Sequence, residues 1–199
     1  MSNNYMLTVV IPDSLRKGLI EAGYSLCLAR KVGNNDFNVI WQGNKQYLKN
    51  NDFEWSQEYQ VFASKAFKDG ALVKAVSDPQ DIEYKQVCIF DNYGTMNPAT
   101  ADKNGKEGSF KVENQYQTLN FAVSTKVNGL YRTIYVTPSA ITGSVAFEPK
   151  NEVRVWFALH TETSTMISDI MGKYIDIPYG KLVSRSVEYQ EDGSWHIIA

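Results

Sequence analysis

The stretch that decides the fold is Phe121–Val136, FAVSTKVNGLYRTIYV, in which two alternating runs flank an Asn-Gly pair. Asn128 and Gly129 favour a type I′ turn, because that turn requires positive φ at both central positions. Alternating runs on both sides of such a turn predict an antiparallel β-hairpin. The more polar face of this hairpin is expected to carry Tyr131 and Tyr135.

The turn also predicts which residues pair across the hairpin, since side chains on facing strands meet in register. On the apolar face the predicted pairs are Val127 with Leu130, Val123 with Ile134 and Phe121 with Val136. On the other face they are Lys126 with Tyr131, Ser124 with Thr133 and Ala122 with Tyr135.

Similar alternation, punctuated by Gly, Asn, Asp and Pro, recurs along the chain and predicts further strands. They are Met6–Ile11, Ser25–Val32, Phe37–Gln42, Val61–Phe67, Ala71–Val76, Ile82–Phe90, Val153–His160, Leu182–Tyr189 and Trp195–Ile198. Two segments favour short helices: Asp13–Gly23 and Ser164–Lys173. Strands at this spacing predict an all-β fold, a single-domain antiparallel β-sandwich over residues 1–199 with one or two short helices, a barrel being the next alternative.

The bulk properties exclude several classes of protein. The chain has 199 residues, 43% of them hydrophobic, and a formal net charge of −2, whereas nucleic-acid-binding proteins usually carry a basic excess. No apolar run has the roughly 18–20 residues of a transmembrane helix. The first residues also lack the features of a signal peptide, so we expect synthesis without one. The expected location is the cytoplasm, or the exterior after lysis or non-classical release.

Neither cysteine is predicted to be a catalytic nucleophile. Cys27 and Cys88 each lie within an apolar run, which predicts buried thiols and not nucleophiles. Motifs typical of zinc sites are missing from the sequence, and it predicts no cofactor. A calcium site formed by loop carboxylates such as Asp91 and Asp102 is an alternative.

His160 raises the question of catalysis, because Glu162 and Ser164 follow it closely. A hydrolytic triad, however, draws its members from separate segments, and no Gly-x-Ser-x-Gly elbow is present. The simpler interpretation is a histidine at the end of a strand. A hydrolase that uses His160 or a pair of carboxylates is the weaker alternative, the acidic candidates being Glu54, Glu58, Glu148 and Glu162.

Aromatic residues supply the leading functional hypothesis. Tyr and Trp can stack on a sugar ring or lie at a lipid interface, with one apolar face and one polar group. The residues expected to contact a ligand are Trp55, Tyr59, Tyr131, Tyr135 and Trp156. They favour a non-catalytic binding protein of the lectin or membrane-targeting, cytolysin-like kind, which recognises a glycan or a lipid headgroup. The opposing interpretation is that a second sheet covers these side chains and makes them core.

A second class of function uses the sheets themselves. Exposed edge strands can pair with another chain, so a structural or interaction module that forms a homo-oligomer is the alternative hypothesis.

Overall fold

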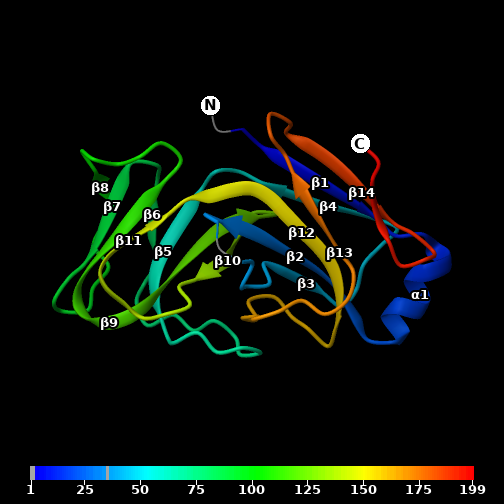
Figure 1. The fold of residues 1–199 in the computed structure, drawn as a ribbon, viewed down its shortest axis with the longest axis horizontal. Helices are drawn as coiled ribbons and strands as arrows, with labels where there is room; N and C mark the ends of the chain where they lie inside the picture. The colour runs from blue at the N-terminus through cyan, green and yellow to red at the C-terminus, as the bar shows by residue number, and fades with distance from the viewer. Residues whose placement is uncertain (1–2, 35) are drawn as a thin grey trace.

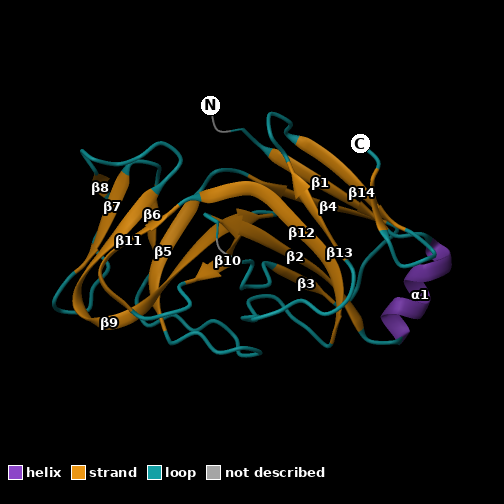
Figure 2. Ribbon diagram, in the orientation of Figure 1, coloured by secondary structure: helices purple, strands orange, loops and turns teal. Residues whose placement is uncertain are grey.

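A computed structural model describes residues 3–34 and 36–199, and these form three β-sheets with one helix. The first sheet has the order β15 (Trp195–Ile197), β14 (Ser184–Tyr189), β1 (Tyr5–Val10), β4 (Asn50–Trp55). The second has the order β13 (Tyr174–Pro178), β12 (Pro149–Leu159), β2 (Tyr24–Val32), β3 (Gln42–Asn44). The predicted all-β, sandwich-like fold is confirmed (Figure 2).

The third sheet is built around β9 (Phe110–Val127), the longest strand. Along its path lie β6 (Gln80–Ile82), β5 (Tyr59–Ser64), β9, β7 (Gln86–Phe90) and β8 (Thr100–Ala101), with β10 (Leu130–Val136) and β11 (Ile141–Phe147) also paired to β9. One half of β9 pairs with β7 and β11, and the other half with β5 and β10. The sheet therefore curls, as seen at the left of Figure 1.

Among the described strands, pairing is antiparallel except at two places. β1 runs parallel to β14, and β7 runs parallel to β9. Each parallel pair joins segments that are far enough apart in sequence for a crossover connection, as parallel pairing requires.

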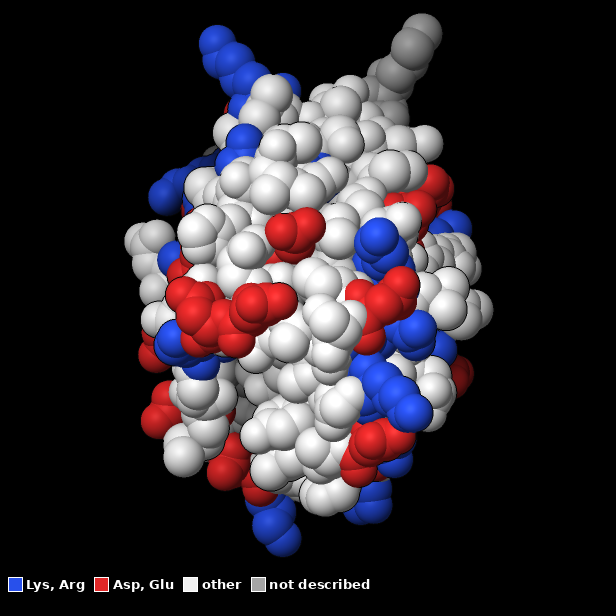
Figure 3. Space-filling view, turned by 90° about the vertical axis from the view of Figure 1, so that its right-hand side faces the viewer, with Lys and Arg blue, Asp and Glu red and all other residues white. Residues whose placement is uncertain are grey.

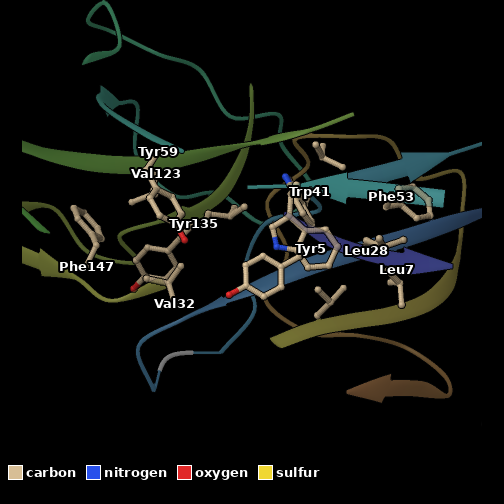
Figure 4. Close-up of a cluster of buried hydrophobic side chains, with 14 of the residues drawn as sticks. Tyr5, Leu7, Leu28, Val32, Trp41, Phe53, Tyr59, Val123, Tyr135 and Phe147 are labelled. Atoms are coloured by element: carbon tan, nitrogen blue, oxygen red, sulfur yellow. The ribbon is translucent and has the colours of Figure 1, made fainter. Parts of the chain in front are cut away.

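One hydrophobic core joins all three sheets. The first two sheets face each other through residues such as Leu7 on β1 and Leu28 on β2, both fully buried. The same cluster continues into the third sheet through Tyr59, Val123 and Phe147 (Figure 4). Alternation along each strand places these side chains on the inner faces.

The hairpin around Asn128-Gly129 is confirmed, but its register changes part-way. The predicted pairs hold from Val127 with Leu130 to Ser124 with Thr133. A bulge then shifts the register, so that Val123 lies opposite Tyr135 instead of Ile134. Because a β-bulge adds one residue to one strand, the side chains beyond it change faces.

Two further expectations were wrong. The segment Ser164–Lys173 contains no helix, because its backbone pairs with two other segments in extended form: Thr165 accepts from the Ile40 N–H at 2.9 Å, and Met166 donates to Ala71 at 2.8 Å. The predicted strands Phe37–Gln42 and Ala71–Val76 are mainly irregular, since the strand that pairs with β2 begins only at Gln42. The other predicted helix is present as α1 (Asp13–Glu21).

Two glycines provide a matched test of this backbone. Gly129 has φ +82°, and a methyl group there would meet no neighbour within 4 Å, so Gly129→Ala adds backbone strain alone. We expect it to lower the free energy of unfolding by about 1–2 kcal/mol. Gly18→Ala, on the exposed side of α1, should raise it by about 0.5–1 kcal/mol. Urea denaturation measures both, and equal effects of the two substitutions would contradict the predicted turn geometry.

Candidate functional site

Four of the five aromatic residues predicted to contact a ligand are buried, so the expectation that they lie exposed on the surface was wrong. These four are 2–5% exposed: Trp55, Tyr59, Tyr135 and Trp156. The opposing interpretation, that sheet packing covers them, therefore holds for these residues.

Trp55 and Tyr59 belong to the main core. Trp55 stacks on Tyr5 with ring centroids 5.8 Å apart and meets the edge of Trp41 at 5.5 Å. Tyr59 packs against Phe110 at 5.3 Å, and its hydroxyl lies 3.2 Å from that of Tyr84. Both side chains point inward because the facing strands supply aromatic partners.

The bulge in β10 explains Tyr135. Without it, Tyr135 would share the polar face with Tyr131. With it, Tyr135 joins the core and meets the edge of the Phe147 ring at 6.1 Å.

Tyr131 alone stays half-exposed. The Lys126 ammonium lies 5.3 Å from its ring centroid, and that lysine also pairs with Glu58 at 3.1 Å. Hydrogen bonds from the Ser56 hydroxyl and from Lys126 lower the pKa of Glu58. Tyr131 therefore lies in a solvated ion-pair network on the outer face of the third sheet.

His160 closes the end of the β2–β12 pair. Its backbone N–H donates to the Gly23 carbonyl at 3.0 Å, and its φ of +50° ends the strand. The imidazole lies so close to Gly23 that a Cβ there would be 2.6 Å from Cε1. These contacts fit the simpler interpretation of a histidine at a strand end.

The acidic candidates lie on separate elements or make local contacts. Glu148 pairs with Lys150 only two residues away, and Glu162 accepts the Thr165 hydroxyl through its backbone carbonyl. Asp91 accepts hydrogen bonds from its own turn, which lower the pKa of its carboxyl. Among the described residues, no three acidic, histidine or cysteine side chains group as metal ligands would.

A cavity lies at the end of the second sheet near α1, and its volume is about 750 Å³. Mainly apolar side chains line it: Leu19, Tyr24, Ile40, Trp156, Phe157, Ala158, Leu159, Ile167, Ile170, Met171, Tyr189 and Trp195, together with Thr161, Asp169, Gly172, Lys173 and Gly193. Figure 3 views the end of the molecule that carries α1. Charged side chains lie mainly to the left and right of the middle of this face, with acidic groups reaching its centre, and a strip between the two sides is largely uncharged.

Several parts of the chain build the cavity, and α1 contributes Leu19 to it. The end of β12 supplies one wall, where the register sets Leu159 opposite Tyr24 of β2. The irregular segment that follows β12 supplies another wall, from Thr161 to Lys173, and its pairing with residues 38–40 fixes its path. The hairpin of β14 and β15 adds Tyr189 and Trp195.

Aromatic rings form one side of the cavity. Phe157 stacks on Trp195 at 5.3 Å, and Tyr189 lies 4.9 Å from both rings. Burial raises the pKa of the Tyr189 phenol, which therefore stays protonated and can donate a hydrogen bond at neutral pH. This wall is closely packed and mainly apolar, with the Tyr189 hydroxyl as a polar group.

Few charged groups reach the cavity. Lys173 donates to the backbone carbonyl of Asp192 at 3.0 Å, which ties its ammonium to the C-terminal hairpin. Asp169 lies on the same irregular segment and accepts from the Ile170 N–H at 2.8 Å. The cavity is therefore suited to bury an apolar group of a ligand away from water.

Of the predicted ligand-contacting residues, only Trp156 lines this cavity. Little in the sequence points to the other lining residues, because they come from segments that are remote in the chain. The sequence places Trp195 in the predicted C-terminal hairpin, but its packing against Phe157 depends on the tertiary fold.

Comparison with known proteins identifies no relative: no protein-family model matches the chain, and no curated protein or solved structure is significantly similar to it. Within residues 3–34 and 36–199, the single helix is too short to cross a membrane.

Both cysteines are buried, as predicted, and both are free. Burial raises the pKa of the Cys27 thiol to about 12 and that of Cys88 to about 11. Because the thiolate is the reactive form, we expect both to resist iodoacetamide at pH 8 in the folded protein and to react in denaturant. Mass spectrometry of the alkylated protein checks this. Rapid modification of the folded chain would contradict the burial.

Proposed function

We propose that this protein is a non-catalytic binding protein that holds the apolar part of a lipid-like ligand in the cavity at the end of β12. The observation that carries the proposal is the cavity of about 750 Å³, lined chiefly by aliphatic and aromatic side chains. Small-molecule sites are typically of this size and apolar, with a few polar groups that orient the ligand.

Exposed apolar side chains at the cavity support a lipid ligand over a glycan. Met171 is 83% exposed and Leu159 is 52% exposed, and both line the cavity. A sugar site would instead use open aromatic faces with polar groups around them. The rings of Phe157 and Trp195 cover each other, so they offer little such surface.

Tryptophan fluorescence tests the location of the ligand. Trp156 and Trp195 line the cavity, whereas Trp41 and Trp55 do not. We expect oleate to change the emission of the wild type and of Trp41→Phe equally, and that of Trp195→Phe less. A glycan panel and phosphatidylcholine vesicles with trapped dye are titrated in parallel. A response to sugars alone would replace the proposal with a lectin, and equal responses of both variants would place the ligand elsewhere.

Replacement of the exposed apolar side chain Met171 tests whether the cavity takes its lipid from a vesicle. Met171→Asp should weaken binding to phosphatidylcholine vesicles about tenfold, since burial of a Met side chain contributes about 1.5–3 kcal/mol. The change should not affect folding, because the side chain is exposed. Leu130→Asp, at an exposed position in the Asn-Gly hairpin, is the control and should bind as the wild type does. Vesicle co-sedimentation measures both, and equal losses would indicate a general charge effect.

A further inference from the structure

A buried arginine, Arg30, lies in the main core and does not line the apolar cavity. Arg30 is on β2, opposite Val153 of β12, and is only 1% exposed. It lies two residues beyond Leu28 on the strand, so alternation directs it to the same inner face. A guanidinium carries its charge at all ordinary pH values, so this charge is held inside the protein.

Only one of the three guanidinium nitrogen atoms of Arg30 donates hydrogen bonds to described residues. Nη2 donates to the Lys150 carbonyl at 3.0 Å and to Asn151 Oδ1 at 3.4 Å. Nε and Nη1 have no acceptor among the described residues. Within the same part of the chain, no carboxylate lies within ion-pair distance of Arg30, although Arg154 on the neighbouring strand pairs with Asp176 at 2.6 Å.

Two tryptophans add further donors next to it. The Arg30 Cζ lies 5.4 Å from the Trp41 ring centroid and 5.7 Å from that of Trp55. The two rings stabilise the cation through their faces. Each indole N–H is itself buried and lacks an acceptor in the described chain. Arg30, Trp41 and Trp55, which pack against one another, thus contribute four buried nitrogen atoms that can only donate.

The nearby hydroxyl and amide groups have other partners. The Tyr5 hydroxyl accepts from Asn151 Nδ2 at 2.9 Å, and the Tyr179 hydroxyl donates to the Met6 carbonyl at 2.7 Å. An uncompensated buried charge costs several kcal/mol, and each buried donor without an acceptor adds to that cost. A group that accepts from several donors and carries negative charge would offset both.

We propose that the cluster of Arg30, Trp41 and Trp55 binds a small inorganic anion of chloride size as a structural counter-ion. The full enclosure of the donor atoms favours a small ion over a carboxylate-bearing or phosphate-bearing metabolite. Water is the competing occupant. It differs from an anion because it must also donate its own protons and because its binding does not depend on the salt.

Thermal unfolding in sodium chloride and in sodium gluconate at equal ionic strength tests the proposal. Binding to the folded state alone should raise the melting temperature saturably, by on the order of 5 °C at a hundredfold excess of chloride over its Kd. Gluconate is too large for an enclosed site and should have no such effect. Arg30→Met should abolish the difference between the salts. Arg154→Met is the control, because that guanidinium already has Asp176, and it should keep the difference.

Bromide provides a direct readout on the wild type, which keeps the test decisive even where Arg30→Met does not fold. Crystals grown in sodium bromide should show an anomalous peak within hydrogen-bonding distance of Arg30 and of at least one of the two indole N–H groups. Identical melting in both salts, or an anomalous map without a peak at this cluster, would overturn the proposal and assign water as the acceptor.

Discussion

The rest of the structure depends on the pairing of β12 with β2. One face of this pair, with Leu28 and Val155, forms the main core against the first sheet. The opposite face, with Cys27 and Trp156, forms a second, smaller cluster. The end of the same pair supplies the wall of the apolar cavity, so a single register sets the core and the candidate site together. A shift by one residue would exchange the two faces and remove both.

Period-two alternation was sufficient to predict much of this architecture. It identified β12 and the C-terminal hairpin, because strands with one apolar face repeat every second residue. The bulge after Thr133 was not predictable, since no turn residue marks it and the tertiary packing of Tyr135 stabilises it. The helix prediction for the segment after β12 was wrong for a related reason. The helical pattern of this segment is overridden by backbone pairing with residues 38–40 and 71–73. Local secondary-structure propensity is overridden where distant segments offer backbone hydrogen bonds.

The candidate site was less predictable than the fold. Aromatic side chains in alternating runs look alike whether a second sheet covers them or not, so the sequence could not distinguish Trp55 in the core from Trp156 beside the cavity. The cavity exists only because α1, β12 and the C-terminal hairpin meet in space. The surroundings of Arg30 could not be predicted either, because a charged residue within an apolar strand does not indicate which side chains pack around it.

The parallel pairing of β1 with β14 has a consequence for how the chain acquires its structure. Met6 pairs with Ser184, so β1 gains this neighbour only after all the residues between the two strands have been synthesised. Until then β1 has an unpaired edge on that side, and such an edge can pair with another nascent chain. Contacts between residues so distant in sequence are also slow to form, because a large loop must close first. We therefore expect the closure of the first sheet to be a slow step in folding, during which the edge of β1 stays open to other strands.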